Sequence, residues 1–325
     1  MQDIFIHLGY PKTATTYLQR GLFRDFGFLG NDSAVEGARR LEHDLRSVIC
    51  EDQAEVWRTS RGKEISQRIS TLAGGTSDVY YSSEYWLRGP ATFFPSNSGL
   101  QTPQHSTHMA LEHLKAFQDN VWKEKGRVHV MVTFRRQSNW LGSQYAQISN
   151  RRREPGQADF EHMMTRFIKD EGPHGKSFLD YYLLYSELVK LFGKERVLFL
   201  PVEEVGTPMF WQRFETWSGL KVPPRQEQGS SRQNVRGTAK GRWQTRPRNP
   251  VSGTRAVVVA DEVLRALHLP PKTKSWIKKI EKRVFATHEV TMTSEILAMI
   301  ENAYAESNRA LEKALDCPLS AHGYF

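Results

Sequence analysis

The chain has 325 residues, of which 39% are hydrophobic and 25% are charged. This composition is that of an ordinary globular protein, and it excludes a disordered or fibrous one. Lysine and arginine number 45 against 36 aspartates and glutamates, and the net charge of +9 indicates an anionic ligand, substrate or surface without saying which.

Short, nearly continuous apolar segments predict β-strands that are covered on both faces. These segments are Ile4–Leu8, Val79–Ser82, Val128–Phe134 and Arg196–Leu200. Helical patterns lie between them, at Thr107–Phe117 and at Phe178–Phe192, which stops before Gly193. Strands that alternate with helices imply parallel crossovers. The sequence therefore predicts an α/β fold with a doubly wound parallel sheet.

One domain is expected to span residues 1–325, because this length is somewhat long for one domain and short for two. Glycine, proline, serine and glutamine concentrate at 222–253, which indicates a long basic loop segment. The region 255–325 is expected to be helical, since its last part repeats apolar residues with a period of 3.6.

The apolar runs and the first predicted strand bear on the cellular location of the protein. No apolar run reaches the roughly 20 residues of a membrane span. The first predicted strand begins at Ile4, which leaves no room for a signal peptide, so a cytoplasmic protein is expected.

Cys50 and Cys317 lack a CxxC spacing and are expected to be free thiols. No metal site is predicted, since His105, His108 and His113 do not share one helical face.

The first strand leads into a loop of small and hydroxylated residues, read Gly-Tyr-Pro-Lys-Thr-Ala-Thr-Thr from Gly9. N–H groups at the start of a helix lack acceptors, the helix dipole favours an anion there, and small side chains let a phosphate-sized group approach. We therefore predict an anion site at Lys12. A Walker loop requires G-x-x-x-x-G-K-[ST], which this spacing does not match, because no glycine precedes Lys12 directly.

The stretch YPKTATTYL resembles the 5′-phosphosulfate loop of sulfotransferases that use 3′-phosphoadenylyl sulfate (PAPS), usually written PKTGTTWL. The matching residues are Lys12, Thr13, Thr15, Thr16 and Leu18, while Ala14 replaces the usual Gly and Tyr17 the usual Trp. Alanine suits this position provided that its φ stays negative. The resemblance implies a P-loop-like sulfotransferase fold of the bacterial or glycan type, in which residues 12–17 bind the donor.

The stretch VMVTFRRQSNWLGSQY ends the third predicted strand. The same family places an arginine at this strand end and a serine eight residues later to hold the 3′-phosphate, and Arg135 and Ser143 fit this pattern. A guanidinium fork gives bidentate phosphate contact, and a hydroxyl adds a neutral donor. The family usually has Asn-Pro or Asp-Pro where this chain has Arg136 and Gln137. Arg136 thus remains an alternative ligand of the 3′-phosphate. The spacing favours Arg135, and Arg136 is then expected to be a surface charge.

Glu84 follows the second predicted strand, so its carboxylate is expected at the same sheet edge as Lys12. A carboxylate there can take the proton of an attacking acceptor oxygen. Several branches of the family place a glutamate after this strand, which implies that Glu84 is the general base and that Lys12 stabilises charge on the leaving phosphate. Further along, Lys240-Gly241-Arg242 is similar to an element that closes over PAPS in glycan sulfotransferases.

The resemblance implies an enzyme that moves a sulfuryl group in line from PAPS to a hydroxyl or amine, yielding adenosine 3′,5′-bisphosphate with no metal required. The expected acceptor is a small molecule or a glycan, and no nucleic acid is expected, although Trp243 and Trp276 among basic residues would suit base stacking. Candidate acceptor-lining aromatics are Trp86, Phe93, Phe94 and Trp140. Two alternatives stay open, a P-loop-like kinase using a nucleoside triphosphate and a non-enzymatic module that binds a polyanion.

Overall fold

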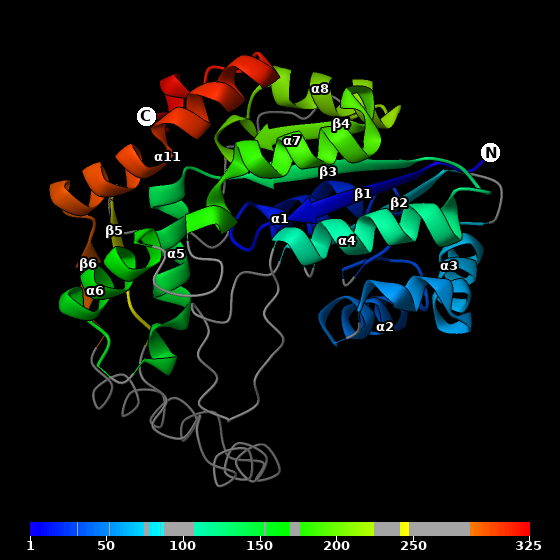
Figure 1. Cartoon of the computed structure of the whole chain (residues 1–325), viewed down its shortest axis with the longest axis horizontal. Coiled ribbons are helices and arrows are strands. Elements are labelled where there is room, and N and C mark those ends of the chain that lie inside the picture. The colour runs from blue at the N-terminus through cyan, green and yellow to red at the C-terminus, as the bar shows by residue number, and fades with distance from the viewer. Residues whose placement is uncertain are drawn as a thin grey trace, which may run out of the picture.

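A parallel sheet of four strands runs through the structure, a computed structural model (Figure 1). The strands are β1 Ile4–Gly9, β2 Val79–Ser83, β3 Val128–Phe134 and β4 Val197–Pro201, in the order β2-β1-β3-β4. Every neighbouring pair is parallel, which confirms the predicted strands to within one residue at either end. The structure describes residues 1–30, 32–51, 53–74, 78–84, 86–87, 107–152, 154–169, 176–223, 241–246 and 287–325.

Helices connect the strands. They are α1 Thr15–Tyr17, α2 Ala38–Glu51, α3 Ser60–Leu72, α4 Thr107–Phe117, α5 Gln137–Ile148, α6 Gln157–Ile168, α7 Tyr181–Phe192, α8 Pro208–Ser218 and α11 Ser294–Leu315. Short 3-10 helices occupy Ala54–Arg58, Ser149–Arg151, Lys176–Leu179, Lys194–Arg196, Val202–Glu204 and Ser320–His322, and wider π-helical turns occupy Leu18–Phe23 and Gln118–Trp122. The π-helical turns at Leu18–Phe23 continue α1 directly.

Both faces of the sheet are covered. Ile4, Ile6 and Leu8 of β1 belong to a large apolar cluster to which α2 to α7 and α11 contribute. Met131 and Leu200 belong to a second cluster on the other face, formed with the helix after α1 and with α8. Side chains alternate between faces along a strand, so one sheet separates two cores. The predicted doubly wound parallel α/β fold is confirmed.

Local signals set several helix ends. Helix α7 begins at Tyr181, three residues after the expected start, because the Asp180 carboxylate accepts from the Leu183 N–H at 3.0 Å and caps the helix there. It ends at Phe192, because the next residue, Gly193, has a φ of 87° that only glycine adopts without cost. Helix α11 is capped by Thr293, whose hydroxyl accepts from the Ile296 N–H.

A small antiparallel sheet lies beyond the carboxyl ends of the parallel strands, beside α5 and α6 (Figure 1). It pairs β5 Arg242–Gln244 with β6 Glu289–Thr291. Trp243 is buried against α5, so close that a β-carbon on Gly142 would lie 2.5 Å from its ring. The idea that Trp243 could stack on a base is therefore wrong, because its ring fills the core.

Several expectations fall largely outside the described residues. They include Lys240, Trp276, Phe93, Phe94 and most of the segments 222–253 and 255–286. Within the part of the chain that the structure describes, no helix is long and apolar enough to cross a membrane. Cys317 is a buried free thiol.

Candidate functional site

The loop between β1 and α1 reverses the chain over a few residues, and this requires unusual backbone angles. Lys12 has a φ of 69° and Ala14 a φ of 57°, both in the left-handed region. The expectation of a negative φ at Ala14 is wrong, because Ala14 stands directly before the first residue of α1 and turns the strand end into the helix. A left-handed residue other than glycine costs about 1–2 kcal/mol. The loop therefore holds local backbone strain at Lys12 and Ala14.

Neighbouring side chains hold this strained loop in place. The Trp140 Nε1–H of α5 donates to the Pro11 carbonyl at 2.7 Å, and the Gln144 amide donates to the same oxygen at 3.4 Å. The Tyr10 hydroxyl is buried and donates to the Phe178 carbonyl at 3.0 Å. Trp140 is thus a fully buried support of the loop, which corrects the expectation that it lines an acceptor site.

The loop residues divide into an inner and an outer set. The Thr13 hydroxyl is fully buried and donates to the Tyr10 carbonyl at 2.6 Å, so it faces the protein interior rather than a ligand. Lys12 is exposed, Thr16 is half-buried, and Tyr17 is 39% exposed. The first N–H groups of a helix have no acceptor within that helix. The outer face of the loop therefore presents a lysine and a helix start.

Glu84 follows β2 and meets this loop, as the sequence predicted from the shared sheet edge. The Thr15 hydroxyl donates to its carboxylate. Burial raises the pKa of Glu84 from 4.5 to about 7, with the positive charge of Lys12 opposing the rise and the negative charge of Asp32 adding to it. Near neutral pH the carboxyl is therefore close to its midpoint, where it can both accept and release a proton.

Glu42 of α2 is a second carboxyl near this strand end, and the sequence reading missed it. Its side chain is only 4% exposed, and it accepts from the Ser83 hydroxyl at 2.6 Å and from the Tyr81 hydroxyl. Burial raises the pKa of Glu42 to about 7, and the charge of Glu84 adds to this rise. A signal was present in the sequence, since position 42 lies three residues before Leu45 on the apolar side of a helix.

Arg135 lies at the end of β3, next to the loop. Its Nη1 donates to the Ser143 hydroxyl of α5 at 3.0 Å and approaches the Lys12 carbonyl at 3.5 Å. The Tyr181 hydroxyl fixes the backbone here by donating to the Arg135 carbonyl at 2.7 Å. Burial lowers the pKa of Arg135, and the charge of Glu203 opposes that change. The structure thus brings Arg135, Ser143 and the lysine loop together.

Arg136 has different partners. Its Nη2 pairs with the Glu301 carboxylate of α11 at 2.5 Å, and its backbone N–H donates to Glu203 at 3.2 Å. The side chain is 17% exposed, so the expectation of a surface charge is wrong. Helix α11 packs over this strand end and takes the guanidinium into an ion pair that joins β3 to the C-terminal helix.

The Gly241-Arg242 element lies against α5, though its arginine faces elsewhere. Gly241 has a φ of 79°, and its carbonyl accepts from the Met292 N–H at 2.9 Å. Along β5, Trp243 points into the core while Arg242 points out and pairs with Glu289 at 3.4 Å. Arg242 is therefore held by the partner strand of the small sheet, through Glu289 of β6.

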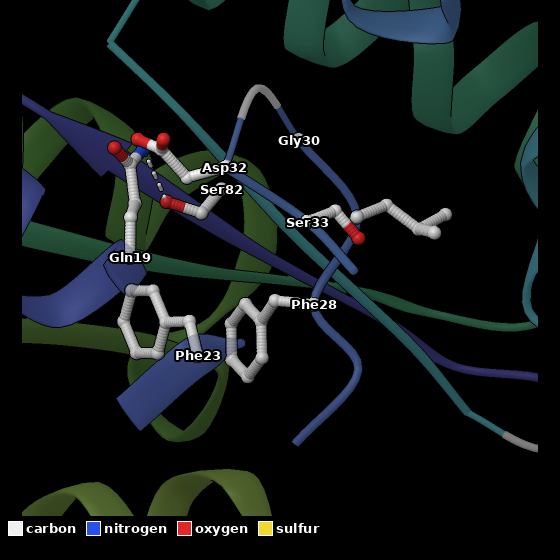
Figure 2. Close-up of a pocket in the computed structure, with 8 residues that line it drawn as sticks. Gln19, Phe23, Phe28, Gly30, Asp32, Ser33 and Ser82 are labelled. Atoms are coloured by element: carbon white, nitrogen blue, oxygen red, sulfur yellow. Dashed lines mark hydrogen bonds between the residues drawn. The ribbon is translucent and has the colours of Figure 1, made fainter. Parts of the chain in front are cut away.

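A hollow lies between Ser82 of β2 and the π-helical turns at Leu18–Phe23 (Figure 2). Its polar wall includes Gln19, Asp32 and Ser33, and its apolar wall includes the rings of Phe23 and Phe28, which stack with centroids 4.1 Å apart. The negative charge of Asp32 acts on Glu84, so the hollow lies near that carboxyl.

The histidines considered for a metal have other partners. His108 pairs with Glu112 at 3.1 Å, and the buried His113 accepts from the Trp57 Nε1–H at 3.1 Å, while His105 lies outside the described residues. Among the residues that the structure places, no group of three or more histidine, cysteine, aspartate or glutamate side chains could hold a metal ion.

Comparison with solved structures finds a similarity that spans the whole chain. No protein-family model and no curated protein matches the sequence. The structure is similar to the crystal structure of a sulfotransferase from Alicyclobacillus acidocaldarius, with 12% sequence identity and a TM-score of 0.47 over 99% of this chain and 98% of that chain. At this identity the likeness says nothing of substrates.

Proposed function

We propose that the protein is a sulfotransferase that uses PAPS as its donor and a hydroxyl or amine as its acceptor. One observation carries the proposal. A lysine loop, an arginine with its serine and a glutamate of raised pKa come from three different strand ends and meet at one edge of the sheet. Ligands of open parallel sheets bind at this edge.

The donor-binding roles follow from charge and geometry. The exposed Lys12 and the start of α1 offer positive charge to the 5′-phosphosulfate, and Thr16 and Tyr17 stand on the same outer part of the loop. The direct hydrogen-bond partners of the Arg135 guanidinium are neutral oxygens, so it can still pair with a phosphate dianion. Ser143 would add its hydroxyl to the same 3′-phosphate.

The proposed chemistry uses Glu84 and Lys12. Glu84 accepts the proton of the acceptor group as its oxygen or nitrogen bonds to sulfur, while the bond between sulfur and the bridging phosphate oxygen breaks. Lys12 stabilises the negative charge that grows on that leaving oxygen. A carboxyl whose pKa is about 7 suits this role, because a general base works best when its pKa lies near the working pH.

Nucleotide binding tests the proposal. We expect adenosine 3′,5′-bisphosphate to bind without Mg²⁺ in isothermal calorimetry, and we expect Mg-ATP to bind at least about tenfold more weakly. Tighter binding of Mg-ATP would favour the kinase alternative. Transfer of labelled sulfate from PAPS to a panel of phenols, alcohols, amines and glycans would then identify the acceptor. Equal, weak binding of all polyanions would favour the non-enzymatic module.

A further inference from the structure

His7 lies in the middle of β1, beneath the lysine loop, and the proposed mechanism does not use it. Its side chain is fully buried. The ring bridges the two neighbouring strands, with Nδ1 2.8 Å from the Ser82 hydroxyl of β2 and Nε2 3.0 Å from the Thr133 hydroxyl of β3. Both ring nitrogens therefore bond to uncharged hydroxyl groups, which cannot stabilise an imidazolium by charge.

On the β3 side, the bond from Thr13 to the Tyr10 carbonyl fixes which group donates in each of the other hydrogen bonds. Thr13 has one hydroxyl proton, which it donates to the Tyr10 carbonyl at 2.6 Å. In its bond with Thr133, at 3.1 Å, the Thr13 oxygen must therefore accept, and Thr133 donates its own single proton. Thr133 in turn has only lone pairs left for His7, so the proton on this side of the ring is on Nε2.

The β2 side agrees with this assignment. The Gln19 amide N–H donates to the Ser82 oxygen at 3.0 Å, as the dashed line in Figure 2 marks. Ser82 then donates its proton to Nδ1, which a neutral ring protonated at Nε2 leaves as an acceptor. Burial supports the neutral ring, since it lowers the pKa of His7 from 6.5 to about 3. One unbroken chain of donors thus runs from Gln19 through His7 to the loop.

We propose that His7 is a positioning residue, held as the neutral Nε2–H tautomer, whose two hydrogen bonds fix the lysine loop at one end and Gln19 in the wall of the hollow at the other. The inference rests on the proposed function only in what the loop binds. Thr13 stands between Lys12 and Ala14, whose left-handed angles need support. Each hydroxyl of the chain donates its one proton to one acceptor, so turning the buried Ser82, Thr133 or Thr13 side chain would leave a buried polar group unpaired.

Two measurements on the ligand-free protein test the chain independently of activity. Nitrogen chemical shifts of the His7 ring at pH 7 should show a proton on Nε2 and none on Nδ1. Hydrogen exchange should then compare the parent with Thr133→Val, which keeps the shape and removes the hydroxyl, and with Thr133→Ser, which keeps the hydroxyl. We expect the amides of Thr13 and Leu18, which bond to Tyr10 and Ala14 carbonyls, to exchange at least about tenfold faster in Thr133→Val alone.

Amides of α3, at the opposite end of the sheet, serve as the control for global unfolding (Figure 1). A third measurement adds the ligand: the affinity for adenosine 3′,5′-bisphosphate should fall about tenfold in Thr133→Val and recover in Thr133→Ser. A proton on Nδ1, an imidazolium at pH 7, or loop exchange that is equal in all three proteins would overturn the inference. A parent that fails to bind the bisphosphate would overturn the proposed function instead, because the shifts and the exchange rates still decide the role of His7.

Discussion

Replacing Glu84 with glutamine should make the protein more stable and nearly inactive at the same time. The change keeps the size of the side chain and an oxygen that can still accept from the Thr15 hydroxyl. It removes a charge that burial disfavours. The pKa of Glu84 rises from 4.5 to about 7, and each pKa unit corresponds to about 1.36 kcal/mol, so ionising this group in the fold costs roughly 3 kcal/mol.

The size of the gain in stability depends on pH. The folded pKa of Glu84 lies above its ordinary value, so the parent protein loses stability as pH rises from about 4.5 to about 7. Glu84→Gln does not ionise and should escape that loss. Urea denaturation should therefore show Glu84→Gln more stable than the parent by up to about 3 kcal/mol at pH 8 and by little at pH 4.

Turnover should change in the opposite direction. An amide cannot take the proton of the acceptor, and the loss of a general base typically costs 10² to 10⁴-fold, roughly 3 to 5 kcal/mol of transition-state stabilisation. The assay is single-turnover sulfate transfer at saturating PAPS, with bisphosphate affinity measured on the same variant. In the parent, kcat/KM should fall below pH about 7 as Glu84 takes up a proton.

Glu42→Gln is the matched control. Burial also raises the pKa of Glu42 to about 7, so Glu42→Gln should likewise escape the loss of stability between pH 4.5 and 7. Its amide nitrogen cannot accept a hydrogen bond, so the variant gives up one of the bonds from the Ser83 and Tyr81 hydroxyls at every pH. Its turnover should stay within about tenfold of the parent. Turnover of Glu84→Gln within about threefold of the parent would refute the role of the carboxylate. Lost bisphosphate binding would instead assign Glu84 to the support of the loop through Thr15.

Three further predictions concern the loop, the two arginines and the buried histidine. Ala14→Gly should raise the free energy of unfolding by roughly 0.5 to 1 kcal/mol in urea, because it relieves a φ of 57°, whereas Ala73→Gly, at a φ of −85°, should lower it. Arg135→Ala should weaken bisphosphate binding by about 2 kcal/mol or more in calorimetry, while Arg136→Ala should leave affinity intact and lower the free energy of unfolding by about 1 kcal/mol. A larger loss of affinity in Arg136→Ala than in Arg135→Ala would assign the phosphate site to Arg136. His7 has a folded pKa of about 3, below its ordinary 6.5, so the parent should lose up to about 5 kcal/mol as pH falls from 6.5 to 3, and His7→Phe should not show this part of the acid loss.

The sheet could be predicted from sequence because its signal is local. Each strand is a short apolar run, and a strand such as β1, buried on both faces, allows few polar residues. The meeting of Glu84 with the lysine loop also followed from sequence, since parallel strands end at one edge. Helix α7 began later than expected because a single capping side chain, Asp180, overrides the apolar pattern at its start.

What the sequence did not reveal depends on contacts between distant segments. The ion pair of Arg136 needs Glu301, 165 residues away, and only the packing of α11 brings them together. The left-handed φ of Ala14 is imposed by the path of the chain from β1 into α1. Alanine itself disfavours a left-handed φ, so the residue type does not predict it. The His7 chain joins three strands and a loop, so no spacing along the chain indicates it.

Calorimetric titration with adenosine 3′,5′-bisphosphate in the absence of Mg²⁺, run side by side on the parent, Arg135→Ala and Arg136→Ala, tests the central claim most directly. The lysine loop and the pair of Arg135 with Ser143 predict binding by the parent, a loss of at least about thirtyfold in Arg135→Ala and little change in Arg136→Ala. No binding by the parent, or equal affinity in all three proteins, would contradict a donor site at this edge of the sheet.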